Sequence, residues 1–300
     1  MEILIIGDVH FGNYSNKDIA AAQVEAAKQI QDWEKENEET YFGSFFCGDI
    51  VHNASKISTS QLELEELCFG GDLNHSISGN HDQESDNFFS LESENLSTAK
   101  SYINYSKNFT NLDNASEWLD GLGTKSCTIH GIPFYRNWSD FYKALELRVG
   151  IAKNYGKNIL LIHQTPNTTA FSENCSDTID INHELFKHFD LIICGHIHEH
   201  KQLSDKFWQI GSLVPLNRSE NTQKYFLSVC TKTLKVTPVP IKTSIEFTEK
   251  KRVENNIKLS TKVREKAESF DLQKEVKKYS DQNEFTDFEK DFSINLIKKI

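Results

Sequence analysis

Short apolar runs alternate with amphipathic stretches over roughly the first 230 residues of the chain. An apolar run that ends within a few residues at polar or turn-forming residues is typical of a buried β-strand. We expect such strands at residues 2–7, 43–47, 127–134, 159–162, 191–194, 207–210 and 225–230. Strands that alternate with helices along a chain favour an α/β layered fold.

The stretches between these strands carry the spacing of amphipathic helices. We expect helices at residues 18–37, 58–67 and 140–155. The first of these places four side chains on one face, namely Ala22, Ala26, Ile30 and Trp33. Residues 82–120 are polar, rich in Ser and Asn, and give weaker helical signals.

The character of the chain changes after about Pro240, where Lys, Glu and Asp dominate and apolar residues become sparse. We therefore expect one domain at residues 1–235 and a small capping or partner-binding region, α+β or helical, at residues 236–300. A strand-like stretch at residues 236–247 joins the two. The alternative is a solvated, charged helical tail with no specific role.

Composition excludes several classes of protein. Hydrophobic residues make up 38% of the chain and aromatic residues 11%, which is enough to fill a core. No run of about 18 apolar residues and no signal peptide is present, so we expect a cytoplasmic protein without membrane contact. Six cysteines are scattered without CxxC spacing, which indicates free thiols in a reducing compartment.

The formal net charge is −11. A protein that binds duplex DNA without a partner usually carries a basic face, because neutralising the DNA phosphates supplies much of the affinity. The acidity therefore weakens a nucleic-acid interpretation. It does not remove that interpretation, since metal ions can offset acidic groups and a partner can supply the basic surface.

The candidate chemistry lies in His, Asp and Asn side chains placed where strands are expected to end. They occur in GDVH, GDIVH, SGNHD, LLIHQTP and ICGHIH, as Asp8, His10, Asp49, Asn80, His81, Asp82, His163, His196 and His198. In open α/β sheets the loops beyond the strand carboxyl ends form the site, so these groups can converge on one crevice. Each motif alone is more often a simple turn. Five such motifs in order, each at the end of an apolar run, indicate one functional site rather than chance.

Imidazole, carboxylate and amide oxygen donors suit Mn, Fe or Zn, whereas a thiolate site would use Cys. Two divalent ions held side by side can bridge a phosphodiester, neutralise its charge and activate water. The donor types therefore point to two-metal hydrolysis of a phosphoester.

The ordered blocks GDVH, GDIVH, GNHD, the strand-final His163 and GHIH resemble the calcineurin-like metallophosphoesterase superfamily over about residues 1–230. The resemblance implies a layered β-sandwich flanked by helices, with two divalent metal ions. We expect manganese, with Mg, Fe or Zn as alternatives.

The resemblance also implies roles for the individual residues. The first metal would be held by Asp8, His10, Asp49 and His198. Asp49 would bridge to the second metal, whose set is completed by Asn80, His163 and His196. His81 would contact the scissile phosphate or protonate the leaving oxygen, with Asp82 or another nearby carboxylate orienting it.

Within the superfamily, several details are similar to SbcD-type DNA repair nucleases. GDIVH carries a histidine, His52, where serine/threonine phosphatases have aspartate, and GNHD replaces the GNHE of those phosphatases. The stretch IGSLVPLNRSEN resembles the GS-x-x-P segment of these nucleases, and CTIHGIPFYRN resembles one of their strands. His52 either contacts the ligand pocket or is a surface turn residue.

This second resemblance implies a Mn-dependent DNA exo/endonuclease in recombination or double-strand-break repair, possibly phage-encoded and then working in the host cytoplasm. It would cut double-stranded ends and single strands together with an SMC-like ATPase. A homodimer would form through residues 58–67 and the segment after Asp82. Residues 285–297 would dock the ATPase or, alternatively, pack back on the nuclease domain.

Two other functions stay open. A metal-dependent phosphatase or small-molecule phosphodiesterase, acting on a nucleotide or cyclic nucleotide, would use the same metals and suits the acidic net charge. A non-catalytic binding protein with a relic metal site is the third, and the intact ligand set argues against it. Metal content after purification separates the relic from the enzymes.

Overall fold

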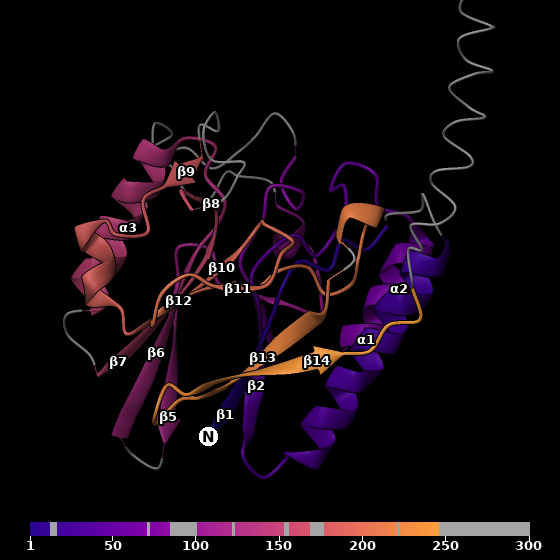
Figure 1. Ribbon diagram of the computed structural model, residues 1–300, viewed down its shortest axis with the longest axis horizontal. Helices are drawn as coiled ribbons and strands as arrows, with labels where there is room; N and C mark the ends of the chain where they lie inside the picture. Colours follow the sequence, from indigo (N-terminus) through magenta and orange to yellow (C-terminus); the bar gives the residue numbers. More distant parts are fainter. Residues whose placement is uncertain are drawn as a thin grey trace, which may run out of the picture. The chain divides into compact units, whose positions relative to one another are not determined.

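The computed structural model describes residues 1–12, 17–70, 73–84, 101–121, 124–152, 156–168, 177–220 and 222–245. These residues all belong to one compact unit, Met1–Glu246. Within the unit, two six-stranded sheets pack face to face, with helices outside them (Figure 1). This confirms the expected α/β class with a layered sandwich flanked by helices.

The first sheet combines parallel strands with two antiparallel strands at one edge. Its strands, in spatial order, are β14 (Val236–Ile241), β13 (Lys224–Cys230), β1 (Glu2–Ile6), β2 (Tyr41–Phe46), β3 (Asn74–Ser76) and β4 (Thr110–Asn111). The strands β1 to β4 run parallel to one another, and β13 and β14 run antiparallel to their neighbours. The carboxyl ends of β1, β2 and β3 therefore lie at the same edge of the sheet.

The second sheet also has parallel strands at its centre, but it has one antiparallel strand at each edge. Its strands, in spatial order, are β11 (Lys201–Gln202), β12 (Phe207–Gln209), β10 (Leu191–Gly195), β7 (Lys157–His163), β6 (Thr124–Ile132) and β5 (Ser116–Gly121). The four central strands are parallel. A further pair, β8 (Thr165–Pro166) and β9 (Thr178–Ile179), forms a small separate ladder.

Alternating side chains build two layers of core, because successive residues of a strand point to opposite faces. Ile3 and Ile5 of β1 pack in the cluster between the sheets together with Ile159 and Leu161 of β7. The intervening Leu160 belongs to the cluster beneath α3 (Trp138–Ala152). Both faces of β7 are therefore buried, which explains why its sequence is a continuous apolar run.

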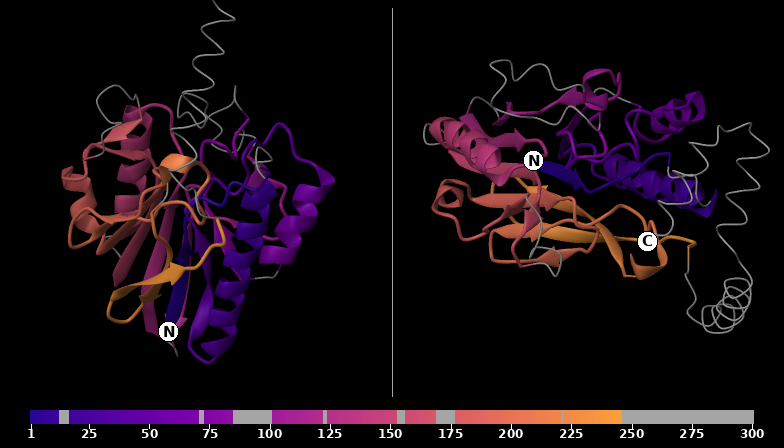
Figure 2. Two further views of the ribbon diagram at one scale, coloured as in Figure 1. Left: turned by 45° about the vertical axis from the view of Figure 1, so that its right-hand side comes forward. Right: turned by 90° about the horizontal axis from the view of Figure 1, so that it is seen from above.

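Helices cover the outer faces of the sandwich, with α1 (Lys17–Glu36) and α2 (Thr59–Phe69) beside the first sheet and α3 beside the second (Figures 1 and 2). On the α1 face predicted to be apolar, Ala22, Ala26 and Ile30 are at most 1% exposed, and Trp33 is half-buried. Ser58 caps α2 in a reciprocal capping box with Gln61. Short 3₁₀ helices are η2 (Tyr102–Asn104), η4 (Glu184–His188) and η5 (Arg218–Glu220).

The seven expected strands and three expected helices are present, with bounds that differ by a few residues. The weak helical signal in residues 82–120 was wrong for the part that the structure describes. There the chain forms η2, β4 and β5 instead, because pairing with β3 and β6 outweighs local preference.

The compact unit ends at Glu246, whereas we expected the boundary after residue 235. The strand that was expected to begin the C-terminal region is β14, and it pairs with β13 over six residue pairs. These hydrogen bonds extend the first sheet and cover the edge of β13. The expected capping region and the expected docking segment at residues 285–297 lie outside the described residues.

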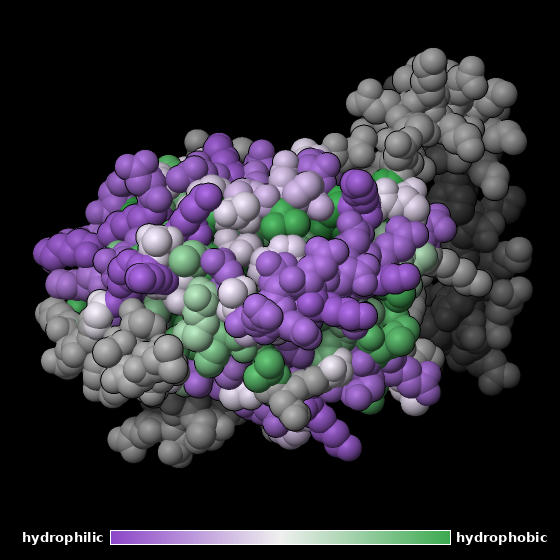
Figure 3. Space-filling view, turned by 90° about the horizontal axis from the view of Figure 1, so that it is seen from below, coloured by the Kyte–Doolittle hydropathy of each residue, from purple (hydrophilic) through white to green (hydrophobic). Residues whose placement is uncertain are grey.

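Four of the five described cysteines are buried and none of the five forms a disulfide, as expected. No helix in the part of the chain that the structure describes is long and apolar enough to cross a bilayer. Seen from below, at the end of the unit where β1 begins, the described surface is mostly hydrophilic, and hydrophobic residues form only small separate groups (Figure 3).

Candidate metal centre

Loops from both sheets meet at the strand carboxyl ends, and glycines allow them to approach closely. Gly48, which precedes Asp49, has a φ of +93°, a conformation that favours glycine. A Cβ on Gly79, which precedes Asn80, would lie only 2.1 Å from Oδ1 of Asp49. The glycines of the GD and GN motifs are thus required because the loop after β3 rests directly on the loop after β2.

Three of the candidate ligands hold backbone conformations that side-chain-bearing residues rarely adopt. His10, Asp49 and His196 have φ values of 55°, 53° and 83°. Such residues cost on the order of 1–3 kcal/mol each and persist where the surroundings enforce them, often at functional sites. Hydrogen bonds hold the backbone of His10 and Asp49 in these conformations, because the amides of Val9 and His10 both donate to the carbonyl of Asp49.

Asp8, His10 and His198 form the first group of donors, with ligand atoms within 4.8 Å of one another. Nε2 of His10 lies 3.1 Å from Nε2 of His198, and the latter atom lies 3.6 Å from Oδ2 of Asp8. Asp8 and His10 are at most 1% exposed. The structure thus brings together residues that are about 190 positions apart in the sequence.

Asp49, His163 and His196 form the second group, again within 4.8 Å. Oδ1 of Asn80 joins them, 3.1 Å from Nε2 of His163 and 2.9 Å from Nδ1 of His196. Oδ2 of Asp49 lies between the two groups, 3.3 Å from Nε2 of His163 and 3.4 Å from Nε2 of His10. All seven residues expected to bind metal therefore converge, with Asp49 in the position of a bridge.

Burial and mutual charge shift the pKa values of these groups. Burial raises the pKa of Asp8 to about 6, and the neighbouring Asp49 carboxylate adds to the rise. Burial lowers the pKa of His196 to about 4, with His163 adding to the fall. Burial also opposes the charge of His163, but the Asp49 carboxylate outweighs it and the pKa is raised to about 9.

Two buried carboxylates side by side favour positive charge next to them, which is why Asp49 and Asp8 both act to raise the pKa of His163. A divalent cation would supply such charge, and imidazole nitrogen with carboxylate and amide oxygen is a donor set that suits Mn, Fe or Zn. The residues present therefore fit a pair of divalent ions.

His81 lies beside the first group, and it forms a third cluster of possible donors with His10 and His52, with ligand atoms within 4.8 Å of one another. Its Nδ1 faces the carbonyl oxygen of His52 at 2.7 Å, so Nδ1 carries the proton and donates it. Its ring stacks on the His52 ring with centroids 5.2 Å apart. His52 reaches the site as well, with Nδ1 3.4 Å from Nδ1 of His10, and is therefore not a simple surface turn residue.

The contacts of Asp82 differ from the expected ones, which were contacts that orient His81. Its side chain is fully buried, and it accepts hydrogen bonds from the amides of Val51 (3.0 Å) and Gly79 (2.9 Å). It thus ties the loop after β2 to the loop after β3. The group that orients His81 is the backbone carbonyl of His52 rather than a carboxylate.

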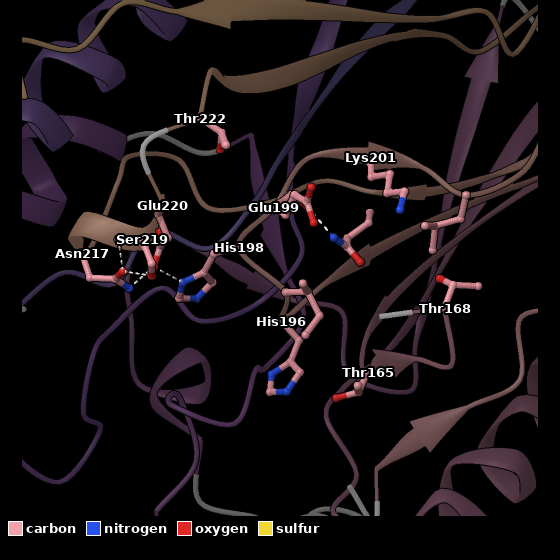
Figure 4. A pocket seen from close by; sticks show the side chains of 13 residues that line it. Thr165, Thr168, His196, His198, Glu199, Lys201, Asn217, Ser219, Glu220 and Thr222 are labelled. Atoms are coloured by element: carbon pink, nitrogen blue, oxygen red, sulfur yellow. Dashed lines mark hydrogen bonds and ion pairs between the residues drawn. The ribbon is translucent and has the colours of Figure 1, made fainter. Parts of the chain in front are cut away.

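Two carboxylates beside the site were not singled out in the sequence. Glu220 of η5 lies 2.9 Å from Nδ1 of His198, and Asp177 lies 3.4 Å from Nε2 of His196. Neither residue directly follows a strand of the two sheets, so the pattern of polar residues at the ends of apolar runs did not identify them. Both histidines line a pocket of about 910 Å³, together with Glu220, Lys201 and Thr165 (Figure 4).

The fold and the site together define a class, the metallophosphoesterases, which hydrolyse phosphoesters with the help of metal ions. The profile of the calcineurin-like phosphoesterases matches residues 1–200, so the chain belongs to that family. The match spans the donor residues that the structure brings together, including His196 and His198.

Similar solved structures include the calcineurin-like phosphoesterase YfkN from Bacillus subtilis, with 14% identity and a TM-score of 0.44 over 79% of this chain and 88% of that one. A novel archaeal phosphodiesterase has 13% identity and a TM-score of 0.36 over 80% of this chain and 99% of the other. Among curated proteins, none matches the chain.

Proposed function

We propose that this phosphoester hydrolase is a two-metal phosphodiesterase whose substrate is DNA and whose metal is manganese. The observation that carries the proposal is the convergence of seven donors in two groups around one shared carboxylate oxygen of Asp49. One ion would be held by Asp8, His10, Asp49 and His198. The other would be held by Asp49, Asn80, His163 and His196.

When bound, the two ions neutralise the charge of the phosphodiester and make water a better nucleophile. The protein's own residues prepare that chemistry. The carbonyls of His52 and Cys47 accept from Nδ1 of His81 and of His163, and leave Nε2 of both rings facing inward. These two rings are thus held in fixed orientations before any substrate arrives.

His81 is the residue that we assign to the substrate. Its backbone amide donates to Oδ1 of Asp49 at 2.8 Å, which fixes the ring beside the donor groups without making it a ligand. Its free Nε2 would contact a phosphate oxygen and, when the ring is protonated, donate a proton to the departing oxygen. His52 would support it by stacking.

Support for DNA as the substrate comes from the segment after β12, which resembles the SbcD-type nucleases. Ser212 of the GS-x-x-P stretch forms a bridge with Asp8, and the amide of Leu213 donates to the Asp8 carbonyl at 2.8 Å. The segment therefore packs directly on the GDVH loop. The SMC-like ATPase, the homodimer through α2 and the segment after Asp82, and a capping or docking role for the C-terminal region belong to the same proposal.

A phosphatase or small-molecule phosphodiesterase is the second candidate. The net charge of −11 disfavours a long polyanion, and the pocket beside His196 and His198 has the size of a small-molecule site. This candidate uses the same donors and differs only in what lies outside them.

The test is digestion of end-labelled linear duplex and single-stranded DNA in manganese, with bis-p-nitrophenyl phosphate in parallel. His81→Ala is the key variant, and His183→Ala is its control, because the His183 ring stacks on Tyr142 and belongs to none of the donor groups. We expect shortened DNA with the wild type and the control and none with His81→Ala, whose metal content should be unchanged. Cleavage of the small diester alone would move the function to the second candidate, and loss of metal in His81→Ala would refute its assigned role.

A further inference from the structure

His198 has a different partner on each of its ring nitrogens. Nε2 faces the donor group, 3.1 Å from Nε2 of His10 and 3.6 Å from Oδ2 of Asp8. Nδ1 faces outward, 2.9 Å from Oε1 of Glu220 (Figure 4). A carboxylate can only accept, so Nδ1 carries the proton and the lone pair of Nε2 is directed at the donor group.

Glu220 is itself held in place. Its Oε2 accepts from the amide of Leu216 (3.1 Å) and from the hydroxyl of Ser212 (3.1 Å). The ammonium of Lys224 lies 3.4 Å from the same oxygen, and Lys224 is only 2% exposed. The carboxylate is thus 11% exposed and has partners on both oxygens, so it is not free to turn away from His198.

The other rings of the site are held differently. Backbone carbonyls fix His163 and His81, at 2.6 Å from Cys47 and 2.7 Å from His52. The Asp177 carboxylate near His196 is more distant, at 3.4 Å, and its Oδ2 also accepts from Thr165 at 2.6 Å. His198 is therefore the ring in the described site whose tautomer depends most directly on one replaceable side chain.

We propose that Glu220 is a positioning residue of the metal site, which fixes the tautomer and the orientation of His198 through Nδ1. The inference rests on the proposed function, since it assigns Glu220 to the metal site of that function. Partners of this kind typically change metal affinity by 10–100-fold when they are removed.

Glu220→Gln tests the inference because the glutamine side chain has the shape of glutamate but can place a hydrogen-bond donor, its NH₂ group, where the carboxylate had an acceptor facing Nδ1 of His198. Oε2 has three donors around it, from Leu216, Ser212 and Lys224, whereas Oε1 has only the side-chain amide of Asn217 besides His198, so the oxygen of the glutamine amide is expected to take the place of Oε2. Its NH₂ group then faces His198 and requires Nδ1 to accept. The proton would move to Nε2, where it points at the donor group and blocks the lone pair.

The matched control is Glu199→Gln. Glu199 is an exposed glutamate in the lining of the same pocket, so the substitution removes the same charge nearby without altering the partner of His198. Any general electrostatic effect on cation binding appears in both variants. An effect on the tautomer appears only in Glu220→Gln.

The experiment is calorimetric titration of the metal-free full-length protein with MnCl₂, together with ¹⁵N NMR of the histidine rings to read the tautomer. We expect Glu220→Gln to bind manganese about 10–100-fold more weakly than wild type and to carry its His198 proton on Nε2. Glu199→Gln should stay within about threefold of wild type.

Wild-type affinity or an unchanged His198 tautomer in folded Glu220→Gln would overturn the inference and leave the proposed function standing. Failure of the wild type to bind manganese would instead overturn the proposed function. If Glu220→Gln does not fold, Glu220→Asp, which keeps the charge and shortens the reach, gives the same test. An affinity of Glu220→Asp equal to wild type would overturn the inference, and a loss of about tenfold or more would support it.

Discussion

Replacing Asp82 by alanine tests whether this buried carboxylate holds two loops of the site together or orients the proposed catalytic histidine. The side chain is fully buried and accepts from the amides of Val51 and Gly79 at 3.0 and 2.9 Å. In Asp82→Ala both amides lose their acceptor in a place that water does not reach. A buried donor left without a partner costs about 1–3 kcal/mol, so the two together cost about 2–6 kcal/mol.

Part of this cost is offset, because the carboxylate itself is poorly suited to its surroundings. Burial raises the pKa of Asp82 to about 8, and the Asp49 charge adds to the rise. Removing the group also removes that unfavourable burial, so we expect a net loss of about 2–4 kcal/mol in the free energy of unfolding. Asp82→Asn keeps one acceptor oxygen and should lose about half as much.

The assay is urea unfolding of the metal-free protein at neutral pH, followed by manganese titration of the folded variants. Weaker manganese binding should accompany the loss of stability, since the two loops carry Asp49 and Asn80. A loss in Asp82→Ala of less than about 1 kcal/mol, with manganese affinity intact, would refute this reasoning. If turnover fell at the same time, Asp82 would have the orienting role that was expected from the sequence.

Three further predictions follow from the same geometry. Gly79→Ala should abolish metal binding, because its Cβ would lie 2.1 Å from Oδ1 of Asp49; metal titration checks this. In contrast, Gly150→Ala in α3 has open space around its Cβ and should stabilise the protein by about 0.5–1 kcal/mol, which urea unfolding checks. Manganese at about 100 times its Kd should stabilise the protein by about 2.7 kcal/mol, visible in thermal unfolding with and without EDTA, and no shift would contradict a metal site. Burial raises the pKa of Asp113 from 3.8 to about 6, so the folded state keeps a proton that the unfolded chain has lost, and this group makes stability fall as pH rises between those values. Asp113→Asn should remove on the order of 1–2 kcal/mol of that pH dependence, and unfolding curves at pH 4 and 6 that keep the wild-type slope would contradict it.

The strands, the helices and the seven candidate metal ligands can be predicted from local residue patterns alone. Strands such as β1 and β7 are marked by apolar runs, because burial on one or both faces demands them. The ligands could be found because they directly follow those runs, where parallel strands bring their carboxyl ends to one edge. Asp8 and His163 were recognisable for this reason before their 4.0 Å proximity was known.

The contacts of each polar group, in contrast, depend on how distant parts of the chain pack together. Asp82 is next to His81 in the sequence, but its carboxylate accepts hydrogen bonds from the backbone amides of Val51 and Gly79. The His81 ring is oriented instead by the carbonyl of His52, 29 positions earlier in the chain. Glu220 lies in the three-residue 3₁₀ helix η5, which is too short to give a periodic pattern, and its position is set by contacts with His198 and Lys224. Such contacts depend on how the two sheets and their loops pack, which local residue patterns do not encode.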